Sequence, residues 1–483
     1  MKEPKGEGTY NVVVIGGGTA GLVTAAGTAG LGGRVALVER ARMGGECLNT
    51  GCVPSKAILS SARLAAHIRD AGAWGLEPQE PRLDVARIWA RMRERRAEIA
   101  PHDSAERFEA LGVDVFHGQA RFTSPHEVEV GGRRLRAKNF VIATGSRPAI
   151  PPIDGLARVS FFTNENLFDD LSQKPQRLTV LGGGPIGCEL GQAFARLGVA
   201  VTLVEHGPRL MRREDADASE IVRQRLEAEG VRVITGGEAK VVVQHDAVLR
   251  VWVEAEGRDR EPVDCDTILV AVGRVANTDG LDLEKAGVAF TSRGVTVDER
   301  LRTSQRHIYA AGDVTGPPHF THLADRHART VVRNILIPWW TVRVDASALP
   351  WCTFTSPEVA RVGLNEQDAV RAGFAYDLYK LPMNQVDRAV VESEELGFAK
   401  VLVAKGNDRI LGATIVSERA GDLIHEIALA MTAGLGLSAI ARTIHAYPTF
   451  SEILRQLADA QQRSRLTPLA RRLFGGIYKR ARR

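Results

Sequence analysis

The sequence predicts an α/β protein with more than one domain, and three observations lead to that prediction. A chain of 483 residues is too long for one hydrophobic core, and a typical size of roughly 150 residues suggests about three domains. Hydrophobic content of 44% and charged content of 25% are ordinary for a globular protein. Many of the 48 glycines fall in phosphate-loop patterns rather than in repeats, which favours an α/β enzyme over a fibrous or disordered chain.

The first such unit begins near the N-terminus. Residues 11–15 form an apolar run of strand length, residues 16–21 read GGGTAG, and a second apolar run ends in Glu39. Gly16 allows a tight turn, Gly18 lets the backbone approach a pyrophosphate, and Gly21 brings the following helix close to the strand. Glu39 can accept hydrogen bonds from ribose hydroxyls. The pattern predicts a dinucleotide-binding, Rossmann-like domain.

The same pattern recurs once along the chain. A strand-like run leads into Gly182, Gly184 and Gly187, and the next run ends in Glu205. In both copies the acid lies 18 positions after the third glycine. A single glycine motif is weak evidence, but two copies in matching context are strong. We therefore expect two bound dinucleotides.

The acid of the second copy bears on which nicotinamide cofactor binds. A carboxylate at Glu205 repels a 2′-phosphate and favours NAD(H). Arg209, Arg212 and Arg213 lie close by in the sequence and keep NADP(H) open as the alternative.

A cysteine pair follows directly after the first unit. Residues 44–56 read GGECLNTGCVPSK, with Cys47 and Cys52 five positions apart. Five positions on a regular helix is slightly too far for a disulfide, so the pair must lie where the start of a helix is distorted. A thiol at a helix N-terminus has a lowered pKa and is reactive. With only five cysteines, the chain has no secreted disulfide framework, and a close pair is more often catalytic or metal-binding.

This segment resembles the redox-disulfide signature of the class I pyridine nucleotide–disulfide oxidoreductases, such as dihydrolipoamide dehydrogenase, glutathione reductase and mercuric reductase. The resemblance implies an FAD cofactor and an electron path from NADH through FAD to the Cys47–Cys52 disulfide and on to an acceptor. It implies that Cys47 exchanges with substrate and that Cys52 lies against the flavin. Lys56 would lie beside the flavin and pair with Glu189.

Further segments resemble this family in the same order along the chain. Residues 143–145 look like the turn where the first domain passes to the second, and residues 271–274 look like the return. Residues 310–313 resemble the second flavin motif, whose Asp313 would meet the ribityl chain, and Gly118 would lie near the adenine. The cofactor-binding residues implied in addition to the two glycine motifs are Gly45, Lys56, Gly118, Ala143, Thr144, Gly145, Gly273 and Asp313.

The resemblance covers nearly the whole chain and predicts its domains. We expect a discontinuous FAD-binding domain and an NAD(P)-binding domain, followed by a C-terminal α+β domain that forms a homodimer and completes each active site from the partner. The expected ranges are 1–150 with 275–345 for FAD, 151–274 for NAD(P), 346–465 for dimerisation and 466–483 for a basic tail.

The expected active-site stretch near the C-terminus departs from the family pattern. Dihydrolipoamide dehydrogenases and glutathione reductases have a histidine before the Pro-Thr pair, oriented by a glutamate, and this chain has Tyr447 there with Glu452 retained. A phenol titrates near pH 10 and is a poor base at neutral pH. His445 could substitute, although two positions away it would point elsewhere.

With a tyrosine at this position the chain resembles mercuric reductases, which carry a tyrosine there too. The C-terminal cysteine pair of those enzymes is missing here. The leading hypothesis is an NAD(P)H-dependent, mercuric-reductase-like flavin reductase of a small disulfide or a thiol-bound soft metal. The alternatives are a dihydrolipoamide dehydrogenase, a flavin-only quinone reductase or diaphorase, and a flavin-binding module anchored by its tail. No residues are predicted to hold a resident metal.

The charge distribution sets the tail apart. The formal net charge is +5, and eight lysines or arginines with no acid lie from Arg463 to the end, so the rest of the chain carries −3. We expect a solvated tail, with weak contact to acidic lipid or nucleic acid as the alternative, and no nucleic-acid role for the rest of the chain. No export signal is evident, which favours the cytoplasm.

Several other residues are expected to have structural rather than catalytic roles. We expect Cys188 and Cys352 to pack in the core, Arg91 to Glu98 to form a solvated helix face, and Gly131-Gly132 to turn a hairpin. The apolar stretch Ile427 to Ala441 is too short for a membrane span and is expected to form a buried helix.

Overall fold

The computed structural model describes residues 9–255, 257 and 259–482. Its contacts divide the chain into two compact units. Unit 1 comprises residues 1–65, 82–206 and 237–346, and unit 2 comprises residues 66–81, 207–236 and 347–483. Strands and helices alternate along most of the chain, as the α/β prediction requires. Residues 207–236, which the sequence analysis places in the NAD(P)-binding domain, group with unit 2, so the expected domain boundaries remain a prediction.

The larger sheet of unit 1 carries the first glycine motif. Its strand order is β3-β2-β1-β6-β5-β4, with β18 also paired to β6. Strands β3, β2, β1, β6 and β18 run parallel, whereas β4, β5 and the start of β6 form antiparallel hairpins. The seven strands are β1 (Tyr10–Ile15), β2 (Val35–Glu39), β3 (Val113–His117), β4 (Ala120–Ser124), β5 (Glu127–Val130), β6 (Arg133–Ile142) and β18 (Ile308–Ala310). The turn at Gly131-Gly132 lies between β5 and β6, which confirms the expected hairpin.

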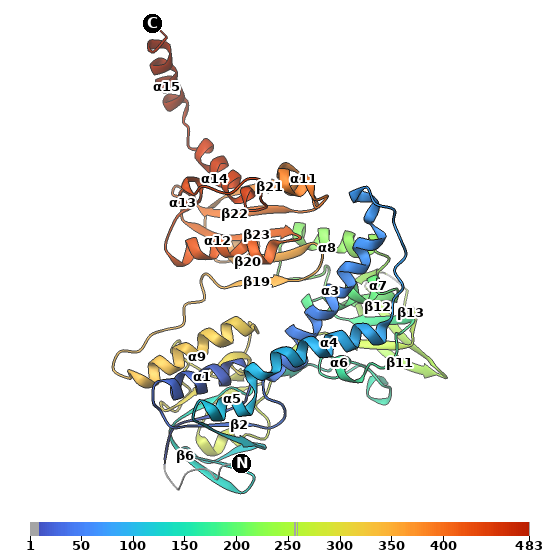
Figure 1. Cartoon of the computed structure of the whole chain (residues 1–483), viewed down its shortest axis with the longest axis vertical. Helices are drawn as coiled ribbons and strands as arrows, with labels where there is room; N and C mark the ends of the chain where they lie inside the picture. The colour runs from blue at the N-terminus through green and yellow to red at the C-terminus, as the bar shows by residue number, and fades with distance from the viewer. Residues whose placement is uncertain (1–8, 256, 258, 483) are drawn as a thin grey trace. The chain divides into compact units, whose positions relative to one another are not determined.

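Two helices cover one face of this sheet. Helix α1 (Thr19–Gly30) lies side by side with α9 (Thr321–Leu336) (Figure 1). Because successive side chains of a strand point to opposite faces, Val12 and Val14 pack toward these helices. Val13 and Ile15 enter a second core with the β4–β6 hairpins. The central strands are apolar on both faces, as buried parallel strands are.

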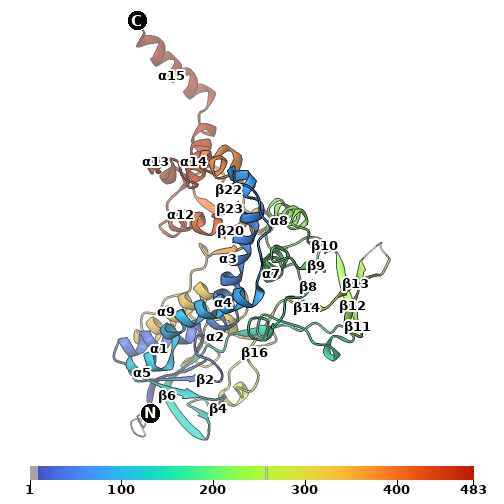
Figure 2. The ribbon, with the colours of Figure 1, turned by 45° about the vertical axis from the view of Figure 1, so that its right-hand side comes forward.

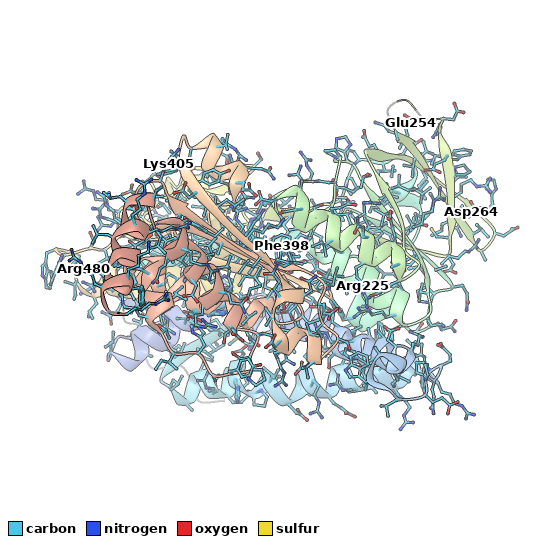
Figure 3. The ribbon with its side chains drawn as sticks, turned by 90° about the horizontal axis from the view of Figure 1, so that it is seen from above. Arg225, Glu254, Asp264, Phe398, Lys405 and Arg480 are labelled. Carbon is cyan, nitrogen blue, oxygen red and sulfur yellow. The ribbon has the colours of Figure 1, made fainter. Side chains whose placement is uncertain are left out.

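A second parallel sheet of unit 1 carries the second glycine motif. Strand β8 (Arg177–Leu181) lies between β9 (Ala200–Glu205) and β14 (Thr267–Val270), and α7 (Pro185–Arg196) follows β8. An antiparallel sheet, on which Figure 3 labels Glu254 and Asp264, and two pairs of two-residue or three-residue strands complete the strands of the unit. These strands are β11 (Gly237–His245), β12 (Val248–Ala255), β13 (Glu261–Cys265), β7 (Ser146–Pro148) with β15 (Arg274–Ala276), and β16 (Phe290–Thr291) with β17 (Gly294–Val295).

Among the described residues, five further helices precede α7, and of these α3 and α4 are long. Helix α4 has an exposed, arginine-rich face, as expected for Arg91 to Glu98, and buries Trp89 and Met92 on the other side. These helices are α2 (Gly45–Asn49), α3 (Cys52–Arg69), α4 (Val85–Ile99), α5 (Ala105–Ala110) and α6 (Leu167–Asp170), with 3-10 turns at Ala71–Trp74, Ala100–Asp103, Leu156–Arg158, Leu283–Ala286 and Gly312–Thr315.

Unit 2 is built on an antiparallel sheet of order β19-β20-β23-β22-β21. All residues of β22 and β23 are buried, because α12 packs on β20 and β23 while α14 packs on β21 and β22. The strands are β19 (Pro350–Thr353), β20 (Glu358–Gly363), β21 (Tyr376–Pro382), β22 (Phe398–Ala404) and β23 (Ile410–Ser417), together with β10 (Arg232–Thr235). The helices are α8 (Ala216–Ala228), α10 (Glu366–Arg371), α11 (Asp387–Val391), α12 (Ala420–Thr432), α13 (Leu437–Arg442), α14 (Glu452–Ser464) and α15 (Pro468–Arg480), with a 3-10 turn at Met383–Gln385.

The stretch Ile427 to Ala441 is not the single buried helix expected. It comprises the end of α12 and most of α13, separated by residues 433–436. Gly434 has a φ of +67°, a left-handed conformation that ends α12. Among the described residues, no helix is both long enough and apolar enough to cross a membrane.

A buried charge cluster lies within unit 2. The ammonium of Lys400 on β22 is fully buried and lies 2.8 Å from Asp215, 2.9 Å from Asp217 and 2.7 Å from Glu366. Burial lowers the pKa of Lys400, but its hydrogen bonds to the three carboxylates outweigh that effect and raise the pKa above its usual value. The cluster therefore joins residues 215–217 to the sheet through charge-assisted hydrogen bonds.

Candidate active site

The first glycine motif forms a tight turn between β1 and α1. Gly16 has a φ of +113°, and a side chain there would meet the backbone of Ala143. A Cβ on Gly21 would lie 1.8 Å from the carbonyl oxygen of Gly16, so only glycine lets α1 start this close to the strand. The carboxylate of Glu39, at the end of β2, accepts a 2.6 Å hydrogen bond from the backbone N–H of Gly17.

The second motif repeats this geometry. Gly182 has a φ of +110°, and a Cβ on Gly187 would lie 1.9 Å from the carbonyl oxygen of Gly182. Glu205 accepts a 2.7 Å hydrogen bond from the N–H of Gly183, as Glu39 does from Gly17. Both Gly18 and Gly184 are extended N-cap residues whose helices begin without a side-chain cap. Each helix N-terminus therefore presents backbone N–H groups to an anion.

These residues fit FAD at the first motif and a nicotinamide dinucleotide at the second. At the first motif, Gly45 approaches Gly18 so closely that a Cβ on Gly45 would lie 2.5 Å from the Gly18 Cα. The glycine loop and the start of α2 thus form one backbone cradle without side chains. Gly184 has open space around its Cβ position, which leaves room for a pyrophosphate.

The cysteine pair lies where α2 ends and α3 begins. Cys47 is on α2, and Cys52 is the first residue of α3, so the distortion expected between them is present at residues 50–51. Both are free thiols, and they share a hydrogen bond. The Sγ of Cys52 also lies 3.6 Å from the hydroxyl oxygen of Thr321, the first residue of α9.

The pKa values of the two thiols are shifted in opposite directions. The hydrogen bond from Cys47 lowers the pKa of Cys52 to about 6, with further help from Thr321 and the charge of Lys56, although burial and Glu189 oppose the change. The pKa of Cys47 is raised, first by its hydrogen bond to Cys52 and then by burial. At neutral pH the reduced pair thus carries one thiolate, on Cys52, and one thiol, on Cys47.

Lys56 lies one turn further along α3. Its ammonium is 2.6 Å from a carboxylate oxygen of Glu189, which is buried on α7. This is the contact that the family resemblance implies. The ion pair joins the cysteine helix to the helix of the second glycine motif, and Lys56 supplies the positive charge that favours the Cys52 thiolate.

A second charged cluster lies on the other side of Cys47. Glu46 forms an ion pair with Arg274 and accepts a 2.8 Å hydrogen bond from Asn164. Arg274 also donates a 2.8 Å hydrogen bond to the hydroxyl of Ser146, which donates a 2.6 Å bond to Asp313. Burial raises the pKa of Glu46 to about 7, and the charge of Asp313 adds to the rise, while Arg274 and Asn164 oppose it.

The two segments predicted to connect the cofactor domains meet beside this cluster. The hydroxyl of Thr144 donates a 2.6 Å hydrogen bond to the carbonyl of Asn277, and the Asn277 amide returns a 2.9 Å bond to Thr144. Strands β7 and β15, which follow Gly145 and Gly273, pair with each other. Elsewhere in unit 1, the N–H of Gly118 donates to the carbonyl of Glu39 at 2.9 Å. Gly118, Ala143 and Asp313 thus follow the ends of parallel strands β3, β6 and β18, where ligands of such sheets bind.

Sequence reasoning missed four contributors to this region: Glu46, Thr321, Asn164 and Ser146. Only Glu46 had a local signal, an acid directly before Cys47. Thr321 is 269 residues from Cys52 in sequence, so a fold was needed to bring it there. The described residues contain no group of three or more histidine, cysteine, aspartate or glutamate side chains arranged to hold a metal ion.

The C-terminal candidates lie in unit 2, where their partners differ from those of a histidine–glutamate pair. Tyr447 is exposed and donates a 2.7 Å hydrogen bond to Asp387, which raises its pKa. Glu452 forms a 2.8 Å ion pair with Arg455. The ring of His445 is buried and lies 3.0 Å from Glu426 and 3.0 Å from the carbonyl of Thr443.

His445 is therefore engaged in its own carboxylate pair with Glu426. Cys188 and Cys352, which were expected to pack in the core, are buried to different degrees. Cys188 is fully buried in α7, whereas Cys352 in β19 is half-buried at the edge of the unit 2 core.

Comparisons with known proteins agree with this geometry. Residues 10–328 match the family described as "Pyridine nucleotide-disulphide oxidoreductase", and residues 349–458 match its dimerisation domain. The chain is 35% identical to a mercuric reductase of Lysinibacillus sphaericus, covering 94% of this chain and 82% of that one. It is 37% identical to a dihydrolipoyl dehydrogenase of Thermus scotoductus, covering 94% and 97%. Among solved structures, a Cu(II) complex of the HOCl-induced flavoprotein disulfide reductase RclA from Escherichia coli has a TM-score of 0.83 at 29% identity, covering 94% of this chain and all of that one.

Proposed function

Because this chain belongs to the pyridine nucleotide–disulphide oxidoreductases, we propose that it passes electrons from NAD(P)H to a Cys47–Cys52 disulfide and on to an acceptor. The acceptor in this proposal is a small disulfide or a soft metal ion bound to thiols. The coarser class follows from the family: an oxidoreductase that uses FAD and NAD(P)H and acts on a sulfur group or a metal ion. The matched dimerisation domain indicates a homodimer.

The observation that carries the proposal is that Cys47 and Cys52 lie at the adjoining ends of α2 and α3, one helical turn from the Lys56–Glu189 ion pair. FAD held by the first glycine motif would accept a hydride from NAD(P)H and would supply its two electrons and one proton to the disulfide. Reduction breaks the Cys47–Cys52 bond and consumes one proton, which leaves a thiol on Cys47 and a thiolate on Cys52. Lys56, held by Glu189, stabilises that thiolate.

The oxidative half then depends on Cys47. As its proton moves to the hydrogen-bonded Cys52 thiolate, the Cys47 sulfur attacks one sulfur of a disulfide substrate, breaks the substrate S–S bond and forms a mixed disulfide. The first substrate thiolate leaves and takes the proton from Cys52, which restores the Cys52 thiolate. Cys52 then attacks Cys47, expels the second substrate thiolate, which takes a proton from water, and restores the internal disulfide.

A metal substrate bound to two external thiols exchanges them for Cys47 and Cys52. One displaced external thiolate takes the proton of Cys47. The two cysteine sulfurs then give two electrons to the metal ion as the Cys47–Cys52 disulfide forms again, and the reduced metal leaves.

The tyrosine at position 447 favours reduction of a disulfide or a metal ion over oxidation of dihydrolipoamide. Oxidising a dithiol requires a group that accepts its proton, and hydrogen bonding to Asp387 raises the pKa of Tyr447 further above its ordinary value. An exchange that delivers the proton to a leaving thiol has no such requirement. We place the reaction in the cytoplasm, where glutathione keeps dithiols reduced.

Anaerobic reduction tests the proposal. The purified FAD-loaded protein is titrated with NADH and then NADPH, and thiols are counted in the native protein before and after. We expect two new titratable thiols per chain and a long-wavelength thiolate–flavin absorption band. Lipoamide, glutathione disulfide, mercuric ion and a quinone are then compared as oxidants. Flavin bleaching with no new thiols would contradict the proposal and favour a flavin-only reductase.

NAD(H) is the preferred cofactor in this proposal because of Glu205. We expect Glu205→Gln to raise the kcat/KM ratio of NADPH over NADH by about tenfold, since the amide removes the charge that repels a 2′-phosphate. The amide oxygen can still accept the hydrogen bond from Gly183, so the loop geometry is kept. Steady-state kinetics with both cofactors measure the ratio.

Glu39→Gln is the matched control, because it makes the same change at the first glycine motif. It is expected to weaken FAD retention and leave the NADPH/NADH ratio unchanged. An unchanged ratio in Glu205→Gln would mean that other groups select the cofactor.

A further inference from the structure

The last helix, α15, contributes no residue to the proposed reaction. It lies after the matched dimerisation domain, which ends at residue 458. It is a well-formed helix: the Thr467 side chain accepts a 3.2 Å hydrogen bond from the N–H of Ala470, and Pro468 occupies the first turn. Figures 1 and 2 show α15 extending beyond α14, and none of its residues is buried.

The exposed residues of α15 include large apolar side chains that a solvated tail does not need. Leu469, Leu473 and Ile477 recur every four residues and so share one face of the helix, with Phe474 and Tyr478 beside them. Each of these five side chains is more than half exposed. A contiguous apolar stripe of this kind marks an interaction surface.

The opposite face is positively charged. Arg471, Arg472 and Lys479 lie on it, and from Arg463 to the C-terminus the sequence has eight basic residues and no acid. Arg480, labelled in Figure 3, follows the apolar stripe at the end of the helix, where a long side chain can extend toward phosphates. The rest of the chain carries a formal charge of −3, so this segment accounts for the net positive charge of the chain.

We propose that α15 is an interfacial helix that docks the enzyme on an anionic phospholipid bilayer. Its apolar stripe would lie among the acyl chains and its basic face among the headgroups. Charge complementarity favours an anionic bilayer, because a basic face without acidic residues attracts anionic headgroups. Repulsion between two such faces opposes the pairing of two α15 helices. Nucleic acid would use the charge but leave the five apolar side chains in water. The inference is independent of the identity of the electron acceptor.

Vesicle flotation with the full-length, FAD-loaded protein tests the proposal. The probes are vesicles of pure phosphatidylcholine and vesicles of phosphatidylcholine with phosphatidylglycerol in a ratio of about three to one. We expect binding only to the anionic vesicles and weaker binding as salt increases. A chain that ends at Arg465 is expected to remain unbound while retaining FAD and NADH oxidation.

Two paired substitutions separate charge from apolar contact. Arg471→Gln with Arg472→Gln is expected to weaken binding about 30-fold, since each basic residue near an anionic surface contributes about 1 kcal/mol. Leu473→Ser with Ile477→Ser keeps every charge and is expected to weaken binding by at least about tenfold. Arg93→Gln with Arg95→Gln on exposed α4 makes the same change in net charge and should leave binding unchanged.

Several outcomes would overturn the inference. One is full-length protein that fails to float with anionic vesicles at low salt, and another is binding that survives removal of residues 466–483. Tail-dependent binding to duplex DNA without vesicle binding would assign the helix to nucleic acid instead. A change in oligomeric state on truncation, measured by sedimentation without vesicles, would assign the stripe to a second copy of the chain.

Discussion

Replacing Cys47 with serine is expected to lower kcat/KM for disulfide or metal reduction by at least about a thousandfold, because a hydroxyl is a far weaker nucleophile than a thiol. Cys52→Ser should have an effect of similar size, since the internal disulfide can no longer form. Steady-state assays with NADH and the acceptor found in the oxidant screen measure both. Cys352→Ser, which changes a half-buried cysteine in unit 2, is the matched control and should retain wild-type activity.

The pair of variants at Cys47 also tests the origin of the Cys52 thiolate. In Cys47→Ser the hydroxyl can still donate to the Cys52 sulfur, so the pKa of Cys52 should stay near 6. In Cys47→Ala this donor is lost, so the pKa should rise and the thiolate should form only at higher pH. Iodoacetamide alkylation measured from pH 5 to 9 gives the midpoint in each variant.

Either of two results would contradict this account. Equal midpoints in Cys47→Ser and Cys47→Ala would mean that Lys56 and Thr321, not Cys47, set the acidity of Cys52. Full reduction of the preferred acceptor by both serine variants would show that electrons leave from the flavin directly, as in a quinone reductase.

The sequence alone was sufficient for features whose cause is local. The two glycine motifs predict tight turns, close helix starts and an acid at the next strand end, and the structure has matching values of φ and matching Glu39 and Glu205 contacts in both copies. The distorted helix start at Cys52 follows from the allowed length of a disulfide. Such features depend on backbone sterics within about 30 residues, so residue identity and spacing determine them.

Features that depend on distant partners could not be predicted in this way. Thr321 reaches Cys52, and Arg274 reaches Glu46, only because the parallel sheets bring their strand ends together. The break between α12 and α13 depends on the left-handed conformation of Gly434. The high apolar content of residues 427–441 gives no sign of that conformation. The engagement of His445 with Glu426 likewise required the packing of α12 against the loop before Tyr447.

Lys400 is the strongest case of a residue whose importance is invisible in the sequence. It lies in a strand of otherwise apolar or small side chains, FAKVLVA, and its ammonium is fully buried among Asp215, Asp217 and Glu366. We expect Lys400→Ala to lower the free energy of unfolding by about 3–5 kcal/mol, because it leaves buried Asp215 without its cation. Urea denaturation at pH 7, followed by circular dichroism, measures the loss.

The control is Lys405→Ala, which removes an exposed lysine from the turn after the same strand and should change stability by less than about 0.5 kcal/mol. Adding Asp215→Asn to a Lys400→Met variant should recover part of the loss, since it removes the unpaired charge as well.

The pH dependence provides a separate check. Burial raises the pKa of Asp217, but hydrogen bonds from Lys380 and Lys400 outweigh it, so the pKa lies below its ordinary value. A depressed carboxyl pKa stabilises the fold above the unfolded-state value, and this stabilisation is lost as the pH falls through the folded-state pKa. In Lys400→Ala the buried carboxylates can instead take up protons in acid. The difference in stability between wild type and Lys400→Ala should therefore be smaller at pH 4 than at pH 7, and a difference that does not change with pH would mean that lost packing, not lost charge pairing, destabilises the variant.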